Sequence, residues 1–418
     1  MSKEIKIAIA GLGTIGGGVY KILVNQIEQI NKRCKNPLKL VAVSNLEKPD
    51  FYQDNDAKFY NNCLDLVEDN QIDVIIELIG GSDGISYKLA KATLEAKKHY
   101  ITANKALIAK HGNELSDIAT QNNVYLNFEA AVAGGIPAIK NLREGLAANR
   151  IEKIIAILNG TCNFILTKME KENLPFDQVL KEAQELGYAE ADPTFDIEGI
   201  DTAHKLVILS AIAQNNKIDF DNVNIEGITK ITIDDIKFAK EFGYKIKLVG
   251  IFEDLNNGQI MQNTYPALVP SDCHIGPIDD SYNAVLIKGN NSDWSLCVGR
   301  GAGEFPTASA VVADAIDIAN DRYVYPLGAQ NSDLGTSNIA NLNDRVGKYY
   351  IRFNADNNPD FIKSKLQDDI IENFTAKEDD GKITYGIFTK SIAEKEILTL
   401  KEKFAEDNNF VFIRIENI

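Results

Sequence analysis

The sequence predicts an α/β protein built from more than one domain. A short apolar strand at residues 5–10, IKIAIA, runs directly into a glycine-rich turn and then into a helical pattern. Apolar, strand-like segments continue to alternate with helical patterns as far as residue 128, which is typical of a doubly wound parallel sheet. The length of 418 residues and the 44% hydrophobic content suffice for two or three cores.

The turn after the first strand has the pattern Gly-x-Gly-x-x-Gly, formed by Gly11, Gly13 and Gly16, and a helix is expected at 17–31. Glycines in this setting allow a tight turn and let a pyrophosphate approach the helix N-terminus closely. We therefore predict a Rossmann-type dinucleotide-binding domain. The less favoured alternative is that the glycines serve the turn alone.

Further strands are expected after this unit, and helices between them. The strands are predicted at 40–43, 72–78, 100–102 and 124–128, and the helices at 86–98 and 106–122. The acid that usually binds the ribose after the second strand is missing, because Ser44 and Asn45 stand there. Glu47 could serve the ribose of NAD and Lys48 the 2′-phosphate of NADP, so the cofactor preference stays open.

The pattern changes twice further along the chain. A polar segment at 326–345, rich in Asn, Ser and Gly, is typical of a linker. Beyond it the predicted order is βαββαβ, that of a ferredoxin-like unit, which we expect to be separable. The predicted domains are a dinucleotide-binding domain at 1–134 to which a helix at 305–322 returns, an α+β catalytic and oligomerisation domain at 135–325, the linker at 326–345 and a ferredoxin-like domain at 346–418.

The strongest chemical signal lies between Gly187 and Lys205, GYAEADPTFDIEGIDTAHK. Several acids precede one lysine, and the helix that begins near Ile200 continues with apolar residues. Asp201 and Lys205 therefore share one helix face at the edge of a core. A lysine in such a place suits proton transfer, although an ordinary i,i+4 ion pair on a helix surface is the favoured interpretation when the pair is viewed alone.

Composition excludes several classes of protein. Acidic residues outnumber basic ones by 60 to 44, which gives a net charge of −16, so neither nucleic acid nor a membrane surface is an expected partner. The five cysteines are widely spaced and form no zinc pattern, which indicates reduced thiols and a cytoplasmic location. Neither a leader nor a membrane-spanning run is expected.

Several segments together resemble the homoserine dehydrogenase family, over about three quarters of the chain. They are GLGTIGGGV at 11–19, ELIGG at 77–81, ANKAL at 103–107, FEAAVAGGIP at 128–137, NGTCNFIL at 159–166, LGYAEADPTFDIEGIDTAHKL at 186–206 and GRGAGEFPTASAV at 299–311. The resemblance implies reversible NAD(P)H-dependent reduction of L-aspartate 4-semialdehyde to L-homoserine, in threonine, methionine and isoleucine biosynthesis. It also implies a homodimer or homotetramer and a C-terminal ACT domain.

The resemblance assigns roles to particular residues. It makes Lys205 the proton donor, places Lys105 near nicotinamide and substrate, and adds Asp201 to the catalytic group. The implied substrate-binding residues are Glu190, Gly187, Asp201, Asp196 and Thr161. The implied cofactor-binding residues are Gly11, Gly13, Thr14, Ile15, Gly16, Lys105, Gly301 and Gly303.

Two further features follow from the same resemblance. A sodium ion is expected at Glu129 with the carbonyls of Val132, Gly134 and Ile136, because hard oxygen ligands suit it. In the ACT-like tail, Asp360 stands after Pro359, where related domains commonly carry a glycine at the effector turn. The additional carboxylate argues against threonine feedback at this turn.

Other classes of protein fit less well. A hydroxy-acid dehydrogenase would need a catalytic histidine, and His204, beside Lys205, is expected to point away around the helix. A thioester-forming aldehyde dehydrogenase would need Cys162 or Cys297 beside a base, and no such setting is visible. A nucleotide-sensing regulator without turnover would leave the lysines and acids unused.

Overall fold

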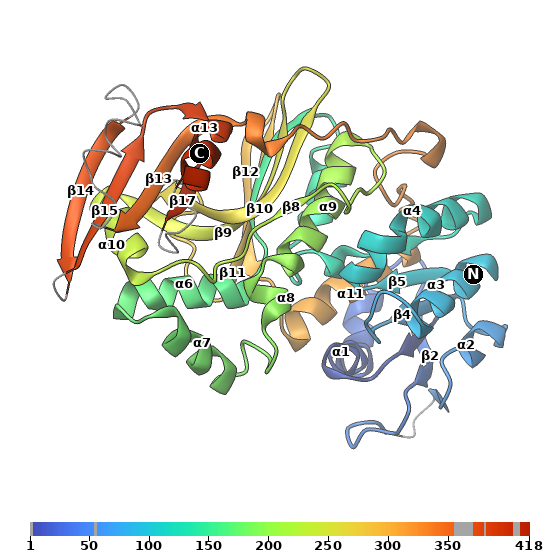
Figure 1. The fold of residues 1–418 in the computed structure, drawn as a ribbon. Coiled ribbons are helices and arrows are strands. Elements are labelled where there is room, and N and C mark those ends of the chain that lie inside the picture. The colour runs from blue at the N-terminus through green and yellow to red at the C-terminus, as the bar shows by residue number, and fades with distance from the viewer. Residues whose placement is uncertain (1–2, 54–56, 355–370, 380–381, 404–409) are drawn as a thin grey trace. The chain divides into compact units, whose positions relative to one another are not determined.

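The computed structural model describes residues 3–53, 57–354, 371–379, 382–403 and 410–418 (Figure 1). The chain divides into two compact units, each assembled from three segments. The first unit comprises 1–153, 204–222 and 283–337, and the second comprises 154–203, 223–282 and 338–418. Each unit is described separately below.

The first unit contains a parallel sheet whose six described strands follow the order β3-β2-β1-β4-β5-β6. This order confirms the doubly wound, Rossmann-like class. The elements are β1 (Ile5–Ala10), α1 (Thr14–Asn31), β2 (Leu38–Ser44), β3 (Lys58–Tyr60), α2 (Asp65–Glu68), β4 (Val74–Glu77), α3 (Ile85–Glu95), β5 (His99–Thr102), α4 (Lys105–Asn122) and β6 (Leu126–Asn127). The short strand β3 was not predicted, because three residues carry no readable alternation.

A late helix, α11 (Glu304–Ala319), completes this unit. Its residues Ala308, Val311 and Ala315 belong to the same core as Val19 and Leu23 of α1. The helices approach closely at Gly18, where a Cβ atom would lie 2.8 Å from Glu304 Cγ. The remaining elements of the unit are the short α5 (Ala138–Lys140), and β11 (Tyr282–Gly289) with its neighbour β12 (Asp293–Arg300).

The second unit is a mixed α/β layer built on a long sheet. Its strand order is β7-β9-β10-β17-β13-β15-β14, and β9 (Tyr244–Asp254) and β10 (Ile260–Pro270) form a long antiparallel pair. The other elements up to residue 282 are β7 (Ile151–Ile157), α6 (Gly160–Glu172), α7 (Phe176–Glu185), α8 (Thr194–Ile197), α9 (Ile200–Gln214), β8 (Asn224–Ile225) and α10 (Ile233–Glu241). Two of them, β7 and α9, cross a boundary between the units.

The C-terminal strands continue this sheet (Figure 1). They are β13 (Val346–Asn354), β14 (Ile371–Asp379), β15 (Lys382–Thr389), β16 (Ile392–Ala393) and β17 (Val411–Ile415), with α13 (Glu394–Lys403) before the last. β17 lies beside β13 and pairs in parallel with β10 through Ala267–Arg414 and Leu268–Ile415. The edge of the tail is therefore joined to the preceding sheet by hydrogen bonds.

The compact units differ from the predicted domain boundaries. The chain does not divide at residue 346, because 338–418 cluster with 154–203 and 223–282. Tyr350, Phe388 and Ile413 share one core with Ile165 of α6 and Leu248 of β9. The alternation of a strand does not reveal which neighbouring strand covers its edge, so the sequence pattern could not indicate this shared core. Separability of the tail stays a prediction. The first helix of the predicted βαββαβ order, expected at 360–366, and the turn with Pro359 and Asp360 lie outside the described residues.

Among the described residues, no helix has both the length and the apolar character needed to cross a bilayer.

Candidate active site

The glycine turn of the first unit has the geometry that its sequence predicts. Gly11 has a φ of +95°, and a Cβ atom there would lie 2.7 Å from the carbonyl oxygen of Leu78. A Cβ on Gly16 would collide with the backbone of Gly11, so this glycine allows the helix to approach the strand. Nothing lies within 4 Å of the corresponding point on Gly13, the residue before α1. This leaves room for a pyrophosphate at the helix N-terminus.

A cavity of about 340 Å³ adjoins this turn at the carboxyl ends of β1, β2 and β4. The described residues that line it are Gly11, Gly13, Ser44, Asn45, Leu46, Asn61, Cys63, Leu78, Ile79 and Ile85, and they include no lysine or arginine. The Asn45 side chain accepts from Leu12 N at 3.2 Å and donates to Glu47 O at 2.8 Å. Lys48 Nζ lies 5.5 Å from the ring centroids of both Tyr52 and Phe59.

A buried carboxylate that the sequence reasoning missed organises the loops after β4 and β5 in the first unit. Glu77, at the end of β4, accepts from Ile79 N and Gly80 N through Oε1, at 2.7 and 2.9 Å. Its Oε2 accepts from Thr102 Oγ1 at 2.7 Å. The Asn104 amide donates to Gly81 O at 2.6 Å, and Asn104 also caps α4, whose first residue is Lys105. Glu77 and Asn104 thereby fix the loops that position Lys105.

Replacing Glu77 by glutamine should lower the free energy of unfolding by about 1–3 kcal/mol and weaken cofactor binding. The amide nitrogen would face either the backbone N–H groups or the Thr102 hydroxyl, all of which donate to Glu77. Urea denaturation and the Michaelis constant for the cofactor provide the readouts. Exposed Glu95, at the end of α3, is the matched control, and Glu95→Gln should change stability by less than about 0.5 kcal/mol. Equal effects of the two substitutions would refute a structural role for Glu77.

The acidic segment of the second unit is organised by Asn159, which the sequence reasoning also missed. Its Nδ2 donates to Asp196 Oδ1 at 2.8 Å and to Asp201 Oδ2 at 2.9 Å. Its Oδ1 accepts from Cys162 N at 2.8 Å and so caps α6. One buried amide therefore holds two of the predicted substrate-binding carboxylates at the start of α6. The available signal was the preference for Asn at a helix N-cap in Asn-Gly-Thr.

The other predicted substrate residues lie at the start of α6 and in the acidic loop. Thr161 is buried, and its hydroxyl donates to Tyr188 O at 2.6 Å, which ties α6 to the acidic loop. Gly187 has a φ of +76°, so the loop bends where a side chain would be strained. Glu190 is exposed, and Gln184 Nε2 donates to its backbone carbonyl at 3.0 Å.

Lys205 is buried on α9, four residues after buried Asp201. The neighbouring residues Leu206, Val207, Ile208 and Leu209 are fully buried, so α9 is apolar on almost every side. Such a helix belongs to a core rather than to a solvated face. The interpretation of Asp201 and Lys205 as an ordinary surface ion pair is therefore wrong, because neither side chain lies on a surface.

The predicted cation ligand Glu129 is a buried residue of the first unit. Its two carboxylate oxygens accept from Ile139 N and Lys140 N, each at 2.9 Å, and its own N–H donates to Asp314 Oδ2 at 2.9 Å. Burial and the Asp314 charge raise the pKa of Glu129 to about 8. In the described part of the chain, no group of three or more His, Cys, Asp or Glu side chains could hold a metal ion.

The glycines of the late loop have clear packing reasons. A Cβ on Gly301 would lie 2.0 Å from the amide of Asn283, and a Cβ on Gly134 would lie 2.4 Å from Gly301 O. Gly303 has a φ of +117° and precedes α11. Packing and the turn before α11 account for these glycines locally, and the cofactor role of Gly301 and Gly303 stays a prediction.

The residues that competing enzyme classes would use are otherwise engaged. His204 packs against Phe220, with the ring centroids 4.5 Å apart. All five cysteines are unbridged, as expected. Cys162 is fully buried and donates to Asp196 O at 3.2 Å, and burial raises the pKa of Cys297, which disfavours a thiolate nucleophile.

Two family models match the chain. The model described as "Homoserine dehydrogenase, NAD binding domain" matches residues 11–129, and the model described as "Homoserine dehydrogenase" matches residues 137–316. The first range contains the glycine turn and Glu77, and the second contains Asn159 and the acidic segment.

Curated relatives and solved structures agree with these matches. Homoserine dehydrogenase of Neisseria gonorrhoeae is 40% identical over 407 residues, which cover 95% of this chain and 92% of the relative. That of Pseudomonas aeruginosa is 39% identical over 410 residues, covering 94% of each. The crystal structure of a homoserine dehydrogenase from Thiobacillus denitrificans has a TM-score of 0.89 at 38% identity, covering 100% of this chain and 99% of that one. A hyperthermophilic archaeal homoserine dehydrogenase in complex with NADPH has a TM-score of 0.65 at 26% identity, covering 77% and 99%. The chain belongs to the homoserine dehydrogenase family.

Proposed function

We propose that this chain reduces L-aspartate 4-semialdehyde to L-homoserine, reversibly and with NAD(P)H, using Lys205 as the proton-transfer group. The observation that carries the assignment of roles is Asn159, which gathers Asp196 and Asp201 immediately ahead of a lysine on a buried helix. NAD(P)H supplies the hydride when bound. Reduction of an aldehyde places negative charge on its oxygen, and an ammonium group both stabilises that charge and delivers the proton.

Lys105 is proposed to act beside Lys205, close to nicotinamide and substrate. It is the first residue of α4 and follows β5, at the edge where open parallel sheets bind ligands. Glu77, Thr102 and Asn104 support its position through hydrogen bonds. Asp201 is proposed as the carboxylate that holds the substrate and lies nearest to Lys205 in the helix.

The substrate is an amino acid, so its ammonium group needs acidic partners. Asp201 and Glu190 are proposed to bind it, with Asp196 behind them and the Gly187 backbone alongside. A carboxylate offers about four acceptor sites, so the Asn159 bond orients Asp201 without exhausting it. Thr161, at the N-terminus of α6, is proposed for the substrate carboxylate.

Asp201→Asn and Glu190→Gln should each raise the Michaelis constant for homoserine about tenfold or more, and leave that of the cofactor nearly unchanged. Each removes a charge-assisted hydrogen bond of about 1.5–3 kcal/mol and retains the shape. Initial rates with either ligand varied provide the measurement. Glu185→Gln, at the exposed end of α7, is the control. An equal rise for both ligands would indicate a folding defect and contradict the assignment.

The cofactor site is proposed to prefer NAD over NADP. Within the described part of the chain its lining contains no basic side chain, and Lys48 lies over two aromatic rings. A 2′-phosphate would therefore meet only the neutral groups of Ser44, Asn45 and Asn61. Initial-rate homoserine oxidation should give a lower Michaelis constant with NAD, and this assay also tests the activity itself. No oxidation with either cofactor would refute the function, whereas a lower constant with NADP would refute only the preference.

The sodium ion is retained as a proposal. The donor set suits it, because a Glu129 charge is otherwise costly inside the unit, as its raised pKa indicates. Glu129 would hold the ion together with the carbonyls of Val132 and Gly134, and with that of Ile136, which also accepts from Ala138 N at 2.7 Å. Ala133 and Gly134 both have positive φ values, so the backbone turns sharply here.

The remaining assignments concern the tail, the assembly and the location of the protein. The tail strands lie in the order β17-β13-β15-β14, with the last strand beside the first, as a ferredoxin-like ACT module requires. A role in threonine and methionine biosynthesis, a homodimer or homotetramer, a cytoplasmic location and the absence of nucleic-acid and membrane partners stay predictions. The small-molecule substrate follows from the family.

A further inference from the structure

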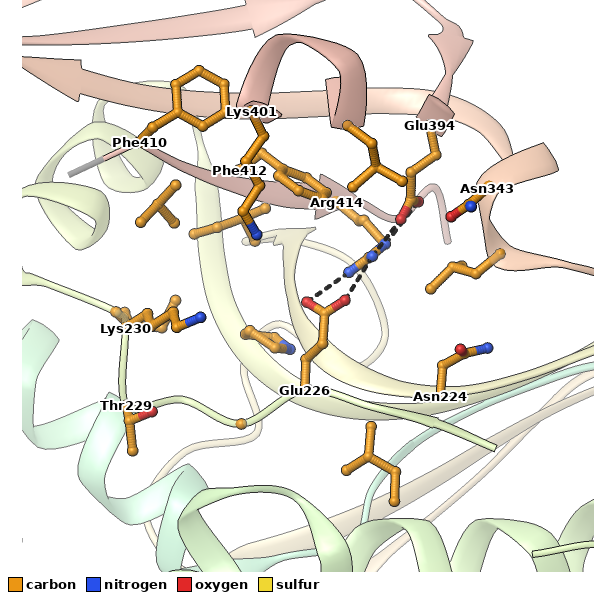
Figure 2. A pocket seen from close by; sticks show the side chains of 18 of the residues that line it. Asn224, Glu226, Thr229, Lys230, Asn343, Glu394, Lys401, Phe410, Phe412 and Arg414 are labelled. Atoms are coloured by element: carbon orange, nitrogen blue, oxygen red, sulfur yellow. Dashed lines mark hydrogen bonds and ion pairs between the residues drawn. The ribbon is translucent and has the colours of Figure 1, made fainter. Parts of the chain in front are cut away.

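The second unit contains a cavity of about 660 Å³ that has no part in the proposed chemistry (Figure 2). Its walls come from the segment after β8, from α13 and from β17, so it combines the tail with the rest of the unit. Among the residues that the structure describes, three cationic and three anionic side chains line it, together with an apolar wall. The charged residues are Lys230, Lys401, Arg414, Glu198, Glu226 and Glu394, and the apolar ones are Leu398, Phe410, Phe412 and Ile413.

Arg414 binds two carboxylates that differ in their surroundings. Its Nε donates to Glu394 Oε2 at 2.9 Å, and Glu394 is buried and also accepts from Tyr349 Oη at 3.3 Å. On its other edge, Nη1 and Nη2 donate to the two oxygens of Glu226 at 3.0 and 2.8 Å. The Glu226 side chain is 44% exposed, whereas that of Glu394 is 2% exposed.

Because Glu226 is exposed and Glu394 is buried, an external carboxylate could replace Glu226 on Arg414. Buried Arg414 is already neutralised by Glu394, so replacing Glu226 with another carboxylate keeps the local charge unchanged. Breaking a buried ion pair without replacement is costly, but exchanging one bidentate carboxylate for another is not. The exposed edge of Arg414 is therefore a carboxylate-binding site, and in this structure the side chain of Glu226 fills it.

A second anionic group would find partners across the cavity. Figure 2 shows Lys230 and Lys401 reaching into it from different walls, on the side of Glu226 away from Asn343. Lys401 Nζ lies 5.6 Å from the centroid of Phe412, which holds the lysine stem against the apolar wall. A ligand with one carboxylate would leave these two ammonium groups unused.

We propose that this cavity binds a small dicarboxylate, with one carboxylate replacing Glu226 on Arg414 and the other held by Lys230 and Lys401. Because Glu226 competes from within the chain, at an effective concentration on the order of millimolar, the ligand gains its advantage from the two lysines and the apolar wall. The site is regulatory in position, since none of the proposed catalytic residues lines it.

Release of Glu226 would reach the substrate-binding segment through tight backbone contacts. Ile228 N donates to Ile197 O at 2.8 Å, and a Cβ on Gly227 would lie 2.3 Å from that same oxygen. A Cβ on Gly199 would lie 3.1 Å from Glu226 O. The segment that carries Glu226 is therefore packed against the residues between Asp196 and Asp201. This coupling rests on the proposed substrate role of those two acids, whereas the binding step does not.

Binding can be measured on the full chain by thermal shift with succinate, at an ionic strength held constant with sodium chloride. A saturable rise in melting temperature is expected. Lys401→Ala should weaken the succinate dissociation constant about tenfold, and Glu226→Gln, which weakens the internal competitor, should tighten it about tenfold. Exposed Lys395 lies on the same helix outside the cavity, and Lys395→Ala should leave the constant unchanged.

Several results would overturn the proposal. They are the absence of a saturable shift, equal weakening by Lys401→Ala and Lys395→Ala, and an equal or larger shift with propionate or inorganic phosphate.

The coupling is tested separately by the Michaelis constant for homoserine, which succinate should raise at lower concentration in Glu226→Gln than in the parent. Inhibition that is identical in the parent, Glu226→Gln and Lys401→Ala would place succinate at the substrate site and refute the coupling. Absence of homoserine oxidation would refute the function and leave the binding result standing.

Discussion

Lys205→Ala should lower turnover by ~10²–10⁴-fold while changing the Michaelis constant for the cofactor little. The alanine removes the group proposed to protonate the developing alkoxide, and it leaves the glycine turn and its cavity untouched. Lys205 is buried in α9 beside a fully apolar run, so no water-exposed group on that helix face is positioned to replace it. Steady-state kinetics in both directions, at saturating cofactor, provide the measurement.

Two further variants test whether the loss of turnover is specific to Lys205. Exposed Lys217, in the same unit, controls for loss of a positive charge, and Lys217→Ala should retain parental turnover. Lys105→Ala should impair turnover and cofactor affinity together, because Lys105 is proposed to serve both. Near-parental turnover in Lys205→Ala, with a marked loss in Lys105→Ala, would transfer the proton-transfer role to Lys105.

Removal of residues 344–418 should abolish native folding of the second unit. The truncation would expose the edge of β10, which pairs with β17, and would strip Tyr350, Phe388 and Ile413 from the core shared with Ile165. Each large buried side chain is worth about 3–5 kcal/mol, and whole domains are stable by only about 5–15 kcal/mol. Circular dichroism melting and hydrogen exchange should show a molecule without a cooperative transition for this unit.

A single substitution tests the contact between the tail and the rest of the second unit without removing any residue. Arg352 Nε donates to the fully buried Asp235 at 2.7 Å, so Arg352→Leu should destabilise by about 3–5 kcal/mol by leaving that carboxylate unpaired. The matched control is the exposed pair of Lys35 with Asp321, where Lys35→Ala should cost about 1 kcal/mol or less. A truncated protein that melts cooperatively and oxidises homoserine would refute the shared core.

The first unit shows how far local patterns lead. Gly11, Gly13 and Gly16 form the tight turn between strand and helix that their spacing predicts, and the strands after them follow the predicted alternation. The acidic segment and Lys205 were also found in the sequence, because charge beside an apolar helix is unusual. Glu77, which organises loops of the first unit, and Asn159, which organises the acidic segment of the second, were missed, because each acts through partners that are distant in the sequence.

The sequence by itself determined the family, the activity, the cofactor turn and the identity of the candidate catalytic residues. These features depend on residue type and short-range spacing, which a linear chain displays directly. Tertiary structure alone decided that the tail is part of the second unit's core, that Asn159 joins Asp196 to Asp201, and that Arg414 binds both Glu226 and Glu394. Each of these depends on which distant segments cover a strand edge or share a buried charge, and no local pattern records that choice.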